Sequence, residues 1–476
     1  MKIMLAASEV VPYAKTGGLA DVAGALPKEL GRLGHDARLI MPRYAKIKQE
    51  LTTVKSGLEV ELGERRVAFD LLGDDSQGYR AYFVDCPELF DRPGLYGEDG
   101  ADYPDNDARF ALFAKAVLAS LEALEFIPEV VHCHDWQTGL VPLLLKEGDH
   151  PALADVGTLF TIHNLAYMGT FPPRRALPLI GLGEDVFRSE GGLEYYGKVN
   201  YLKAGLVFAD LLNTVSEQYA REIQTPEYGY GLEGVLSSRS SELHGVLNGI
   251  DYELWNPAED EHLPAGYSAQ DPSGKAECKA ALQREYGLPV EPGLPVYGMV
   301  SRLADQKGLD LFAEAAGDFF DRELQFILLG TGDPKYHALF EKLAAEYPKR
   351  CGVKLAYDAA QAQRIYGGAD LFLMPSRYEP CGLGQLISLA YGTLPVVRAT
   401  GGLADTIDDG VNGFSFERYT ADAFMDTVDR SLDAFADTER WSELRRTAFA
   451  GDFSWTRSAE RYVELFEQAA AKRRNS

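Results

Sequence analysis

The hexapeptide T-G-G-L-A-D occurs twice, at Thr16–Asp21 within "SEVVPYAKTGGLADV" and at Thr400–Asp405 within "RATGGLADTI". Each copy follows an apolar run typical of a buried strand and precedes a stretch with helical periodicity. Paired glycines permit a sharp turn and a close approach to a ligand, and the N–H groups of the next helix can bind an anion. Either pair could instead serve only a tight turn, and the second copy is the better candidate for that structural role.

The segments around the two copies continue the same alternation of strands and helices. Strands are expected at "KIMLAAS", "DARLIMP", "YRAYFVD", "EVVHCH", "GTLFTIH", "DLLNTVS" and "HGVLNGI", and again at "PVYGMVSR", "LQFILLG", "GVKLAY", "LFLMPS" and "LPVVRA". A polar segment rich in Pro, Gly and Ser separates the two series and ends near Gly274. This pattern predicts two doubly wound α/β domains, whose ligands bind beyond the carboxyl ends of the strands.

The composition excludes several classes of protein. The chain has 476 residues, 46% of them hydrophobic and 25% charged, as in soluble proteins with more than one core. No apolar run approaches the roughly 20 residues of a membrane span, and Glu9 interrupts the apolar start, which favours a buried strand over a signal peptide. A formal net charge of −25 argues against nucleic acid or an anionic membrane as partner. Five scattered cysteines indicate a reducing compartment, and we expect a cytoplasmic protein.

Three cations stand at predicted strand ends in this acidic chain. Lys15 precedes the first copy, while Arg302 and Lys307 lie in "VSRLADQKGLDLF" just after a strand. Arginine offers a planar fork and lysine a compact charge to phosphate oxygens, so the set predicts a diphosphate site, although each residue alone could be ordinary surface charge. In "LLGTGDP", Lys335 stands where the third glycine of G-x-G-x-x-G belongs, which argues against a nicotinamide cofactor.

The stretch "MPSRYEPCGLGQLISLAYGTLPVV" combines a strand, a turn and the start of a helix. The strand is expected to end at Ser376, Glu379 lies in the turn, and C-G-L-G-Q opens the helix. A carboxylate followed by backbone N–H groups can bind the hydroxyls of a sugar and the phosphate attached to it. A lone acid before a helix can also serve only the helix dipole, and Glu379 by itself does not decide between these roles.

Histidines gather near two strand ends of the first half. His132, His134 and Asp135 lie in "HCHDWQTG", and His163 and Asn164 lie in "TIHNLAYMG". The first two histidines point to the same face of a strand, but no Cys or His set follows at zinc spacing, so no metal is expected. The second pair is expected to direct polar groups toward a ligand.

Taken in order, the motifs K-T-G-G-L-A-D-V, H-D-W, T-I-H-N-L-A-Y-M-G, N-G-I-D, S-R-L-A-D-Q-K-G and E-P-C-G-L-G-Q-L resemble those of bacterial glycogen synthases and plant starch synthases. No single motif is specific, but the ordered set spans nearly the whole chain. The resemblance implies the GT-B fold class, with two Rossmann-like doubly wound parallel-sheet domains facing an interdomain cleft. We expect an acceptor-side domain at 1–248, a donor-side domain at 249–455, and a C-terminal helix, 456–476, that returns to the first domain.

The resemblance also implies a reaction, the transfer of glucose from ADP-glucose to the non-reducing end of glycogen or another α-1,4-glucan. Configuration is retained, and no metal or other cofactor is used. Tyr357 is expected to stack on the adenine. Carried over by motif, the site residues are, for catalysis, His163, Arg302, Lys307 and Glu379; for donor binding, Lys15, Gly18, Gly332, Tyr357, Cys381, Gly382 and Leu383; and for acceptor binding, Glu9, Tyr96, Asp135, Asn164 and Asn248.

Three places depart from the family's pattern. Gly384 stands where Thr is common, Ala359 and Ala360 stand where an acid is common, and Gln137 follows H-D-W where His or another residue is usual. Two alternatives to the synthase therefore stay open. One is a glucan-binding scaffold or regulator with a weak donor site, and the other is a different nucleotide-sugar-dependent transferase of the same fold. The sequence does not decide between ADP-glucose and UDP-glucose.

Overall fold

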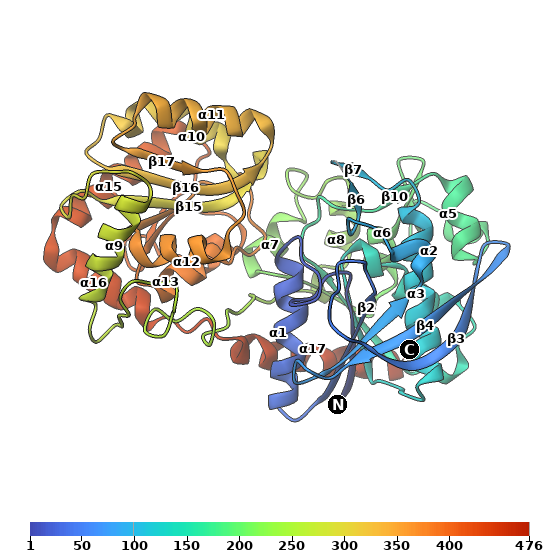
Figure 1. The fold of residues 1–476 in the computed structure, drawn as a ribbon. Coiled ribbons are helices and arrows are strands. Elements are labelled where there is room, and N and C mark those ends of the chain that lie inside the picture. Colours follow the sequence, from blue (N-terminus) through green and yellow to red (C-terminus); the bar gives the residue numbers. More distant parts are fainter. Residues whose placement is uncertain (99, 476) are drawn as a thin grey trace. The chain divides into compact units, whose positions relative to one another are not determined.

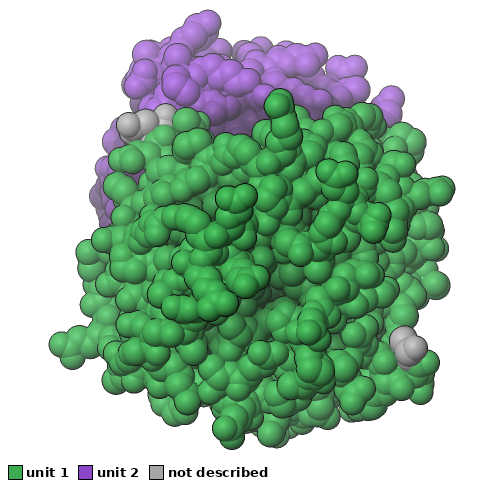
Figure 2. Space-filling model, turned by 90° about the vertical axis from the view of Figure 1, so that its right-hand side faces the viewer, with its two compact units in different colours: residues 1–215, 220–246, 455–476 green, residues 216–219, 247–454 purple. Residues whose placement is uncertain are grey.

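The computed structural model describes residues 1–98 and 100–475, which form two compact units (Figure 1). Unit 1 comprises residues 1–215, 220–246 and 455–476, and unit 2 comprises residues 216–219 and 247–454; Figure 2 distinguishes them by colour. Each unit is built on its own sheet, so each is described separately. Within the described residues, no helix has both the length and the apolar character needed to cross a bilayer.

The main sheet of unit 1 has nine strands in the order β14–β13–β9–β8–β1–β2–β5–β4–β3. Strands β14 to β5 pair in parallel, whereas β5–β4 and β4–β3 pair antiparallel. The central strands are apolar on both faces, because helices cover both sides of the sheet. The strands are β1 Lys2–Ala6, β2 Asp36–Pro42, β3 Thr52–Leu62, β4 Arg65–Asp74, β5 Arg80–Asp85, β8 Val130–His134, β9 Gly157–Ile162, β13 Leu211–Thr214 and β14 Leu243–Gly245.

Helices and two small sheets complete unit 1. The last helix of the chain, α17, packs on β9 so closely that a Cβ atom at Gly157 would lie 2.8 Å from the carbonyl oxygen of Ala469. Tyr462 of this helix accepts a 3.2 Å hydrogen bond from Asn213 Nδ2. The helices are α1 Gly18–Arg32, α2 Pro87–Phe90, α3 Asn106–Ala123, α4 Leu140–Glu147, α5 Pro173–Ile180, α6 Tyr201–Phe208, α8 Glu233–Ser238 and α17 Trp455–Arg474, and α7 Glu217–Glu222 spans both units. The short strands are β6 Gly97–Glu98, β7 Ala101–Asp102, β10 Thr170–Phe171, β11 Glu194–Tyr195 and β12 Lys198–Asn200, and the 3₁₀ turns are η1 Trp136–Thr138, η2 Pro151–Leu153, η3 Glu184–Val186 and η4 Ser240–Glu242.

The sheet of unit 2 has six parallel strands in the order β17–β16–β15–β18–β19–β20. Tyr297 and Met299 of β15 belong to one apolar cluster, and Val296 belongs to a second cluster on the other face. Helices α10 and α11 cover the first face, and α9 and α12 cover the second (Figure 1). The elements are β15 Val296–Leu303, β16 Gln325–Gly332, β17 Cys351–Lys354, β18 Leu371–Met374, β19 Leu394–Arg398, β20 Phe414–Phe416, α9 Gly274–Glu285, η5 Asp305–Lys307, α10 Leu309–Phe320, α11 Pro334–Glu346, α12 Ala359–Gly368, α13 Gly384–Ala390, α14 Gly401–Thr406, α15 Ala421–Ala436 and α16 Thr438–Ala450.

In each of the two main sheets, the first strand has the next strand of the chain on one side and a later strand on the other. In unit 1 the chain proceeds from β1 to β2 on one side and returns to β8 on the other side. In unit 2 it proceeds from β15 to β16 and returns to β18. The loops after the two divergent strands separate at such a point and leave room for a ligand. Ligand-binding side chains are therefore expected at the carboxyl ends of β1 and β8, and of β15 and β18.

Candidate functional site

At the β15–β18 point of unit 2, the structure brings Lys307 and Glu379 together. Lys307 Nζ donates to Glu379 Oε2 at 2.6 Å, and Ser376 Oγ donates to the same oxygen at 3.0 Å. Glu379 is only 6% exposed. Gly308, which has φ +70°, ends the turn that carries the lysine; a Cβ atom there would lie 1.9 Å from the carbonyl oxygen of Pro375, so only glycine fits. A buried carboxylate and its cation thus share one strand end, although they are far apart in sequence.

Other predicted donor residues surround the same edge of this sheet. Arg302, at the end of β15, is exposed, and its Nη2 lies 3.4 Å from Gln306 Oε1. Gly332 ends the adjacent strand β16, where a Cβ atom would lie 2.3 Å from the carbonyl oxygen of Leu303. Tyr357 follows β17 and is 80% exposed. A cation and an aromatic ring are therefore accessible along one edge, while Gly332 is explained by strand packing.

The turn after Glu379 is fixed by Gln385. Its Nε2 donates to the carbonyl oxygens of Cys381 at 2.9 Å and Gly382 at 3.0 Å. Gly382 has φ +76°, and a Cβ atom there would lie 2.4 Å from Gln385 Oε1. Burial raises the pKa of the Cys381 thiol to about 12, and a backbone hydrogen bond from Asn248 opposes that shift. This cysteine is therefore a neutral packing residue, and Asn248 lies beside it in unit 2.

Backbone groups of the second T-G-G-L-A-D copy pack against the same turn and hydrogen-bond to it. Gly402 N donates to the carbonyl oxygens of Glu379 and Pro380, both at 3.1 Å. A Cβ atom at Gly401 would lie 1.9 Å from the carbonyl oxygen of Glu379, and one at Gly402 would lie 2.1 Å from that of Cys381. Gly401 also has φ +45°. The second glycine pair is therefore required by packing, as the sequence analysis favoured.

In unit 1, the carboxylate of Glu9 organises the first copy. It is 4% exposed and accepts hydrogen bonds from Thr16 N, from Thr16 Oγ1 at 2.5 Å and from Gly17 N at 3.0 Å. Tyr96 OH also donates to it, at 2.7 Å. These four donors engage both carboxylate oxygens. The two predicted acceptor residues Glu9 and Tyr96 are thus bound to each other, and Glu9 is an anchor for the turn, a role that the sequence did not reveal.

The glycines of the first copy have open space around them. A Cβ atom at Gly17 or Gly18 would meet no atom within 4 Å. Gly17 has φ −146°, an extended conformation open to any residue, and Gly18 has no positive φ. Lys15 Nζ binds the carboxylate of Asp21 at 2.7 and 2.8 Å. Neither conformation nor internal packing demands glycine here, and the open space would allow a close approach to the backbone.

Three buried histidines lie at the carboxyl ends of two neighbouring strands, His132 and His134 within β8 and His163 directly after β9. His134 Nδ1 and His163 Nε2 share a hydrogen bond of 2.9 Å, and the ring of His132 lies 4.0 Å from that of His134. Burial lowers the pKa of His163 to about 3 and holds the pKa values of the other two well below the ordinary range. The three imidazoles are therefore neutral at physiological pH, and His163 can form hydrogen bonds to a sugar without carrying charge.

Asp135 is strained and buried beside these histidines. It has φ 57° and ψ −177°, a backbone conformation that residues other than glycine rarely adopt. Its backbone N donates to Thr161 O at 3.0 Å, and its Oδ1 accepts from His163 N at 2.7 Å. Burial raises its pKa to about 7. Asn164 follows directly, and its Oδ1 accepts from Ala166 N at 3.1 Å. Backbone strain maintained by several contacts is characteristic of functional sites.

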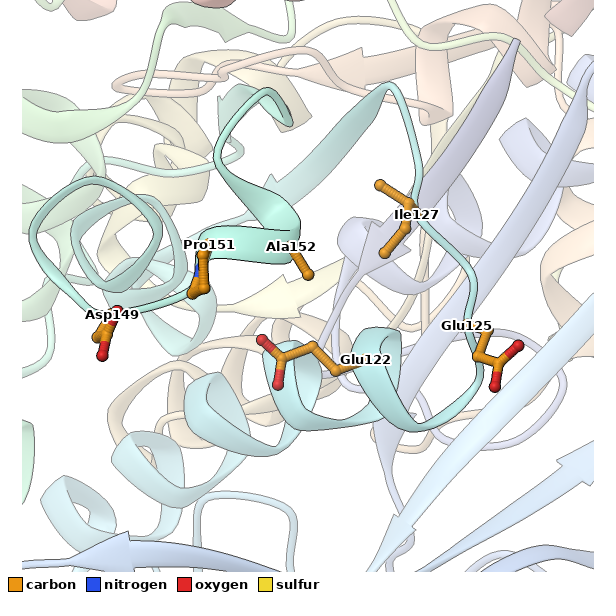
Figure 3. A pocket seen from close by; sticks show the side chains of 6 residues that line it. All are labelled: Glu122, Glu125, Ile127, Asp149, Pro151 and Ala152. Carbon is orange, nitrogen blue, oxygen red and sulfur yellow. The ribbon is translucent and has the colours of Figure 1, made fainter.

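Two further features lie outside this arrangement. Within residues 1–98 and 100–475, no three His, Cys, Asp or Glu side chains group as a metal site would require. A shallow hollow opens at the amino-terminal ends of β8 and β9, opposite to the ends that carry the site residues (Figure 3). Its lining residues are Glu122, Glu125, Ile127, Asp149, Pro151 and Ala152.

Known proteins resemble both halves of this chain. Residues 2–238 match the starch synthase catalytic domain family, and residues 287–447 match glycosyl transferases group 1. The chain is 48% identical to the glycogen synthase of Syntrophotalea carbinolica over 98% of this chain and 99% of that protein. It is 49% identical to the glycogen synthase of Moorella thermoacetica over 100% of this chain and 98% of that one.

Solved structures show the same relationship. The catalytic domain of starch synthase IV from Arabidopsis thaliana, bound to ADP and acarbose, matches with a TM-score of 0.90 at 33% identity over 99% of both chains. A sucrose-phosphate synthase from Thermosynechococcus elongatus, at 19% identity and a TM-score of 0.62 over 99% of both chains, shares the fold. These matches confirm the predicted GT-B fold class, with parallel sheets in two α/β domains.

Proposed function

Because the chain belongs to the family of glycogen and starch synthases, we propose that it transfers glucose from ADP-glucose to an α-1,4-glucan with retention of configuration. The similarity to glycogen synthases shows that the chain is a glycosyltransferase. The identity of the donor, the identity of the acceptor and the retention of configuration are what we propose. The Arabidopsis relative was solved with ADP and acarbose, which supports a nucleotide diphosphate and a glucan-like sugar as ligands of this chain.

The observation that carries the proposal is the contact between Lys307 and Glu379 at the β15–β18 point. A sugar nucleotide has an anionic diphosphate on one side of the anomeric carbon and neutral hydroxyls on the other. Lys307, together with Arg302 and Lys15, would bind the diphosphate, each charge-assisted contact being worth about 1.5–3 kcal/mol. The hydrogen bonds from Lys307 and Ser376 to the Glu379 carboxylate both use Oε2, so we assign Oε1 to a hydroxyl of the transferred glucose.

In the proposed reaction, the bond between the anomeric carbon and the diphosphate oxygen breaks and takes its electron pair to ADP. The 4-hydroxyl of the acceptor attacks the same face, and its proton passes to the departing diphosphate. Glu379 stabilises the positive charge that develops on the sugar and positions its hydroxyls; it forms no covalent bond. The roles of donor binding for Gly18, Tyr357 and the backbone of Cys381, Gly382 and Leu383 remain proposals of the same kind.

Unit 1 is proposed to bind the acceptor and one hydroxyl of the donor glucose. His163 is neutral, so it would bind that hydroxyl through a hydrogen bond without attracting the diphosphate. Asp135 and Asn164 follow the same two strand ends and would bind acceptor hydroxyls, with Tyr96 nearby. No metal is proposed, because Arg302 and the two lysines can supply the positive charge.

The test measures ADP release from ADP-glucose with and without glycogen, and compares UDP-glucose at equal concentration. We expect release that depends on glycogen, a lower rate with UDP-glucose, and α-linked glucose in the product by proton NMR. Glycogen binding without ADP release would instead establish the scaffold alternative. The metal-free proposal predicts an unchanged rate after EDTA treatment and removal of the chelator. Activity restored only by Mg²⁺ or Mn²⁺ would overturn it.

A further inference from the structure

Unit 1 exposes a tyrosine at the tip of a hairpin. Strands β11 and β12 pair antiparallel, and Tyr196 and Gly197 form the two-residue turn between them. The ring of Tyr196 is 78% exposed. It packs edge-on against Tyr195, with ring centroids 4.7 Å apart and an interplanar angle of 86°. One large aromatic ring is thus presented to solvent on an ordered hairpin.

The backbone conformation at this turn disfavours a tyrosine. Tyr196 has φ +47° and Gly197 has φ +78°, so both central residues are left-handed. Two-residue turns of this type favour Asn-Gly, Asp-Gly or Gly-Gly, since bulky side chains are strained at positive φ. Strain of this kind clusters at binding sites, where the side chain serves a purpose other than folding.

A second strained loop supports the same ring. Tyr230 is 40% exposed, has φ +51°, and accepts a hydrogen bond from Tyr195 OH through its carbonyl oxygen. Gly231 follows with φ +79°, and a Cβ atom there would lie 2.9 Å from the hydroxyl oxygen of Tyr196. Gly231 therefore makes room for the exposed ring. Tyr195, Tyr196 and Tyr230 form one patch, which we call the tyrosine surface.

The tyrosine surface is connected to the acceptor-side residues of unit 1. Its hairpin belongs to the sheet β10–β12–β11, and β10 follows the loop that starts at His163 and Asn164. The segment after β12 is fixed to that loop, because Tyr201 N donates to Gly169 O and Leu202 N donates to Met168 O, both at 3.0 Å. A polymer bound at Asn164 would therefore have the tyrosine surface on a continuous piece of the same unit.

We propose that the tyrosine surface binds a part of the α-glucan chain away from its reacting end. The inference rests on the proposed function, which supplies a long neutral polymer as the acceptor. The exposed ring offers an apolar face for the C–H face of a glucose residue, and the tyrosine hydroxyls and the carbonyls of the glycine-rich loops offer hydrogen bonds. An anionic polymer is disfavoured by the net charge of −25.

The decisive variant is Tyr196→Asn, because Asn-Gly suits the turn and removes only the ring. We expect the KM for glycogen to rise about two- to tenfold, as the loss of one stacking contact predicts. KM for ADP-glucose, kcat, and KM for maltotriose, a short acceptor without a distant chain, should stay within about twofold. The melting temperature should not fall. Tyr196→Phe, which keeps the ring, should retain most of the glycogen affinity, and Leu254→Ala, which trims an exposed apolar side chain of unit 2, should match the parent chain.

Native electrophoresis in gels containing glycogen gives a readout that does not need catalysis. The parent chain should be retarded more than Tyr196→Asn, whatever sugar nucleotide the chain uses. Equal retardation and an equal glycogen KM for both proteins would overturn the proposal. A change in sedimentation instead of retardation would assign the surface to a second copy of the chain and would also overturn it. If ADP release fails but the retardation difference remains, the donor proposal is wrong and the tyrosine surface stands.

Discussion

In the first T-G-G-L-A-D copy, a Cβ atom added at Gly17 or Gly18 meets nothing within 4 Å, whereas at Gly401 or Gly402 of the second copy it falls within 2.1 Å of a carbonyl oxygen. The first turn is held by the side chain of Glu9 and leaves its glycines uncovered. The second turn is packed against the backbone around Glu379. The same six residues are thus closely packed in unit 2 and leave open space around both glycines in unit 1.

The surroundings of the two copies differ in charge as well. In unit 1, His134 at the end of β8 and His163 after β9 are buried and neutral, and burial raises the pKa of Asp135 to about 7. Next to the second copy, Lys307 and Glu379 form a close ion pair. Neutral groups suit the hydroxyls of a glucan, whereas fixed charges suit a diphosphate and the charge that develops on a reacting sugar. The neutral strand ends of unit 1 therefore suit the hydroxyls of a glucan, and the ion pair of unit 2 suits the reacting end of a sugar nucleotide.

The largest expected effect separates the two glycine pairs by stability. In Gly402→Ala, the new methyl group collides with the carbonyl oxygen of Cys381, so the free energy of unfolding should fall by roughly 3 kcal/mol. Activity should be lost together with stability, because the backbone N–H of Gly402 is hydrogen-bonded to the carbonyl oxygens of Glu379 and Pro380. Urea denaturation and thermal melting measure the change, with Gly17→Ala as the matched control. Equal stability of Gly402→Ala and Gly17→Ala would contradict the claim that only the second T-G-G-L-A-D copy requires glycine for packing.

The ion pair of unit 2 should give the next largest effect. Lys307→Ala removes the proposed diphosphate contact and leaves Glu379 buried without its cation, so kcat/KM for ADP-glucose should fall at least about tenfold. Lys335→Ala is the matched control, since this lysine forms an exposed pair with Asp305 on the same side of the sheet. The control should stay within about twofold. Near-normal kinetics in Lys307→Ala would remove the residue from the donor site.

The sequence predicted which residues form the strands of both sheets better than it predicted which strands pair with one another. Apolar runs located the central strands of both sheets. The β3–β4 hairpin was missed, because residues 52–57 of β3 are exposed and carry no buried pattern. An exposed antiparallel edge has little hydrophobic signature.

For the site, the sequence predicted positions at strand ends but not the contacts made there. Lys307 and Glu379 are 72 residues apart, so their hydrogen bond depends on the strand order, which no local pattern encodes. The close approach of Gly402 to the carbonyl oxygen of Cys381 likewise depends on the fold and on no local pattern. Glu9 differs in part: Thr16 and Gly17, two of its three partner residues, are seven and eight residues away, yet a lone acid in a loop carried no signal of an anchor.

The open glycines of the first copy give a test by activity alone. Gly18→Ala should leave the melting temperature unchanged or slightly higher, because alanine suits the first turn of α1 and meets no neighbouring atom. If a donor approaches this backbone, kcat/KM for ADP-glucose should fall about tenfold, as a lost close contact predicts. Full activity would show that the first pair serves no ligand, and the contrast with the second copy would then concern packing only.

The smallest effect concerns the protonation of Asp135. Burial raises its pKa to about 7 in the folded chain, while the unfolded value is about 3.9. The folded state therefore holds a proton that the unfolded state has lost, and this stabilising contribution is present below pH 4 and disappears as the pH rises to 7. In Asp135→Asn the group is neutral at every pH, so the contribution is constant.

The measurement is the difference in unfolding free energy between Asp135→Asn and the parent chain from pH 4 to 8. It should grow in favour of the variant by about 1 kcal/mol between pH 5 and 6 and level off above pH 7. The buried histidines act in the opposite direction, since their lowered pKa values make the folded state lose stability as the pH falls below their unfolded value near 6.5. They do so equally in both proteins, so their effect cancels in the difference. A difference that stays flat across this range would mean that Asp135 is ionised in the fold, and the neutral character assigned to this strand end would be wrong.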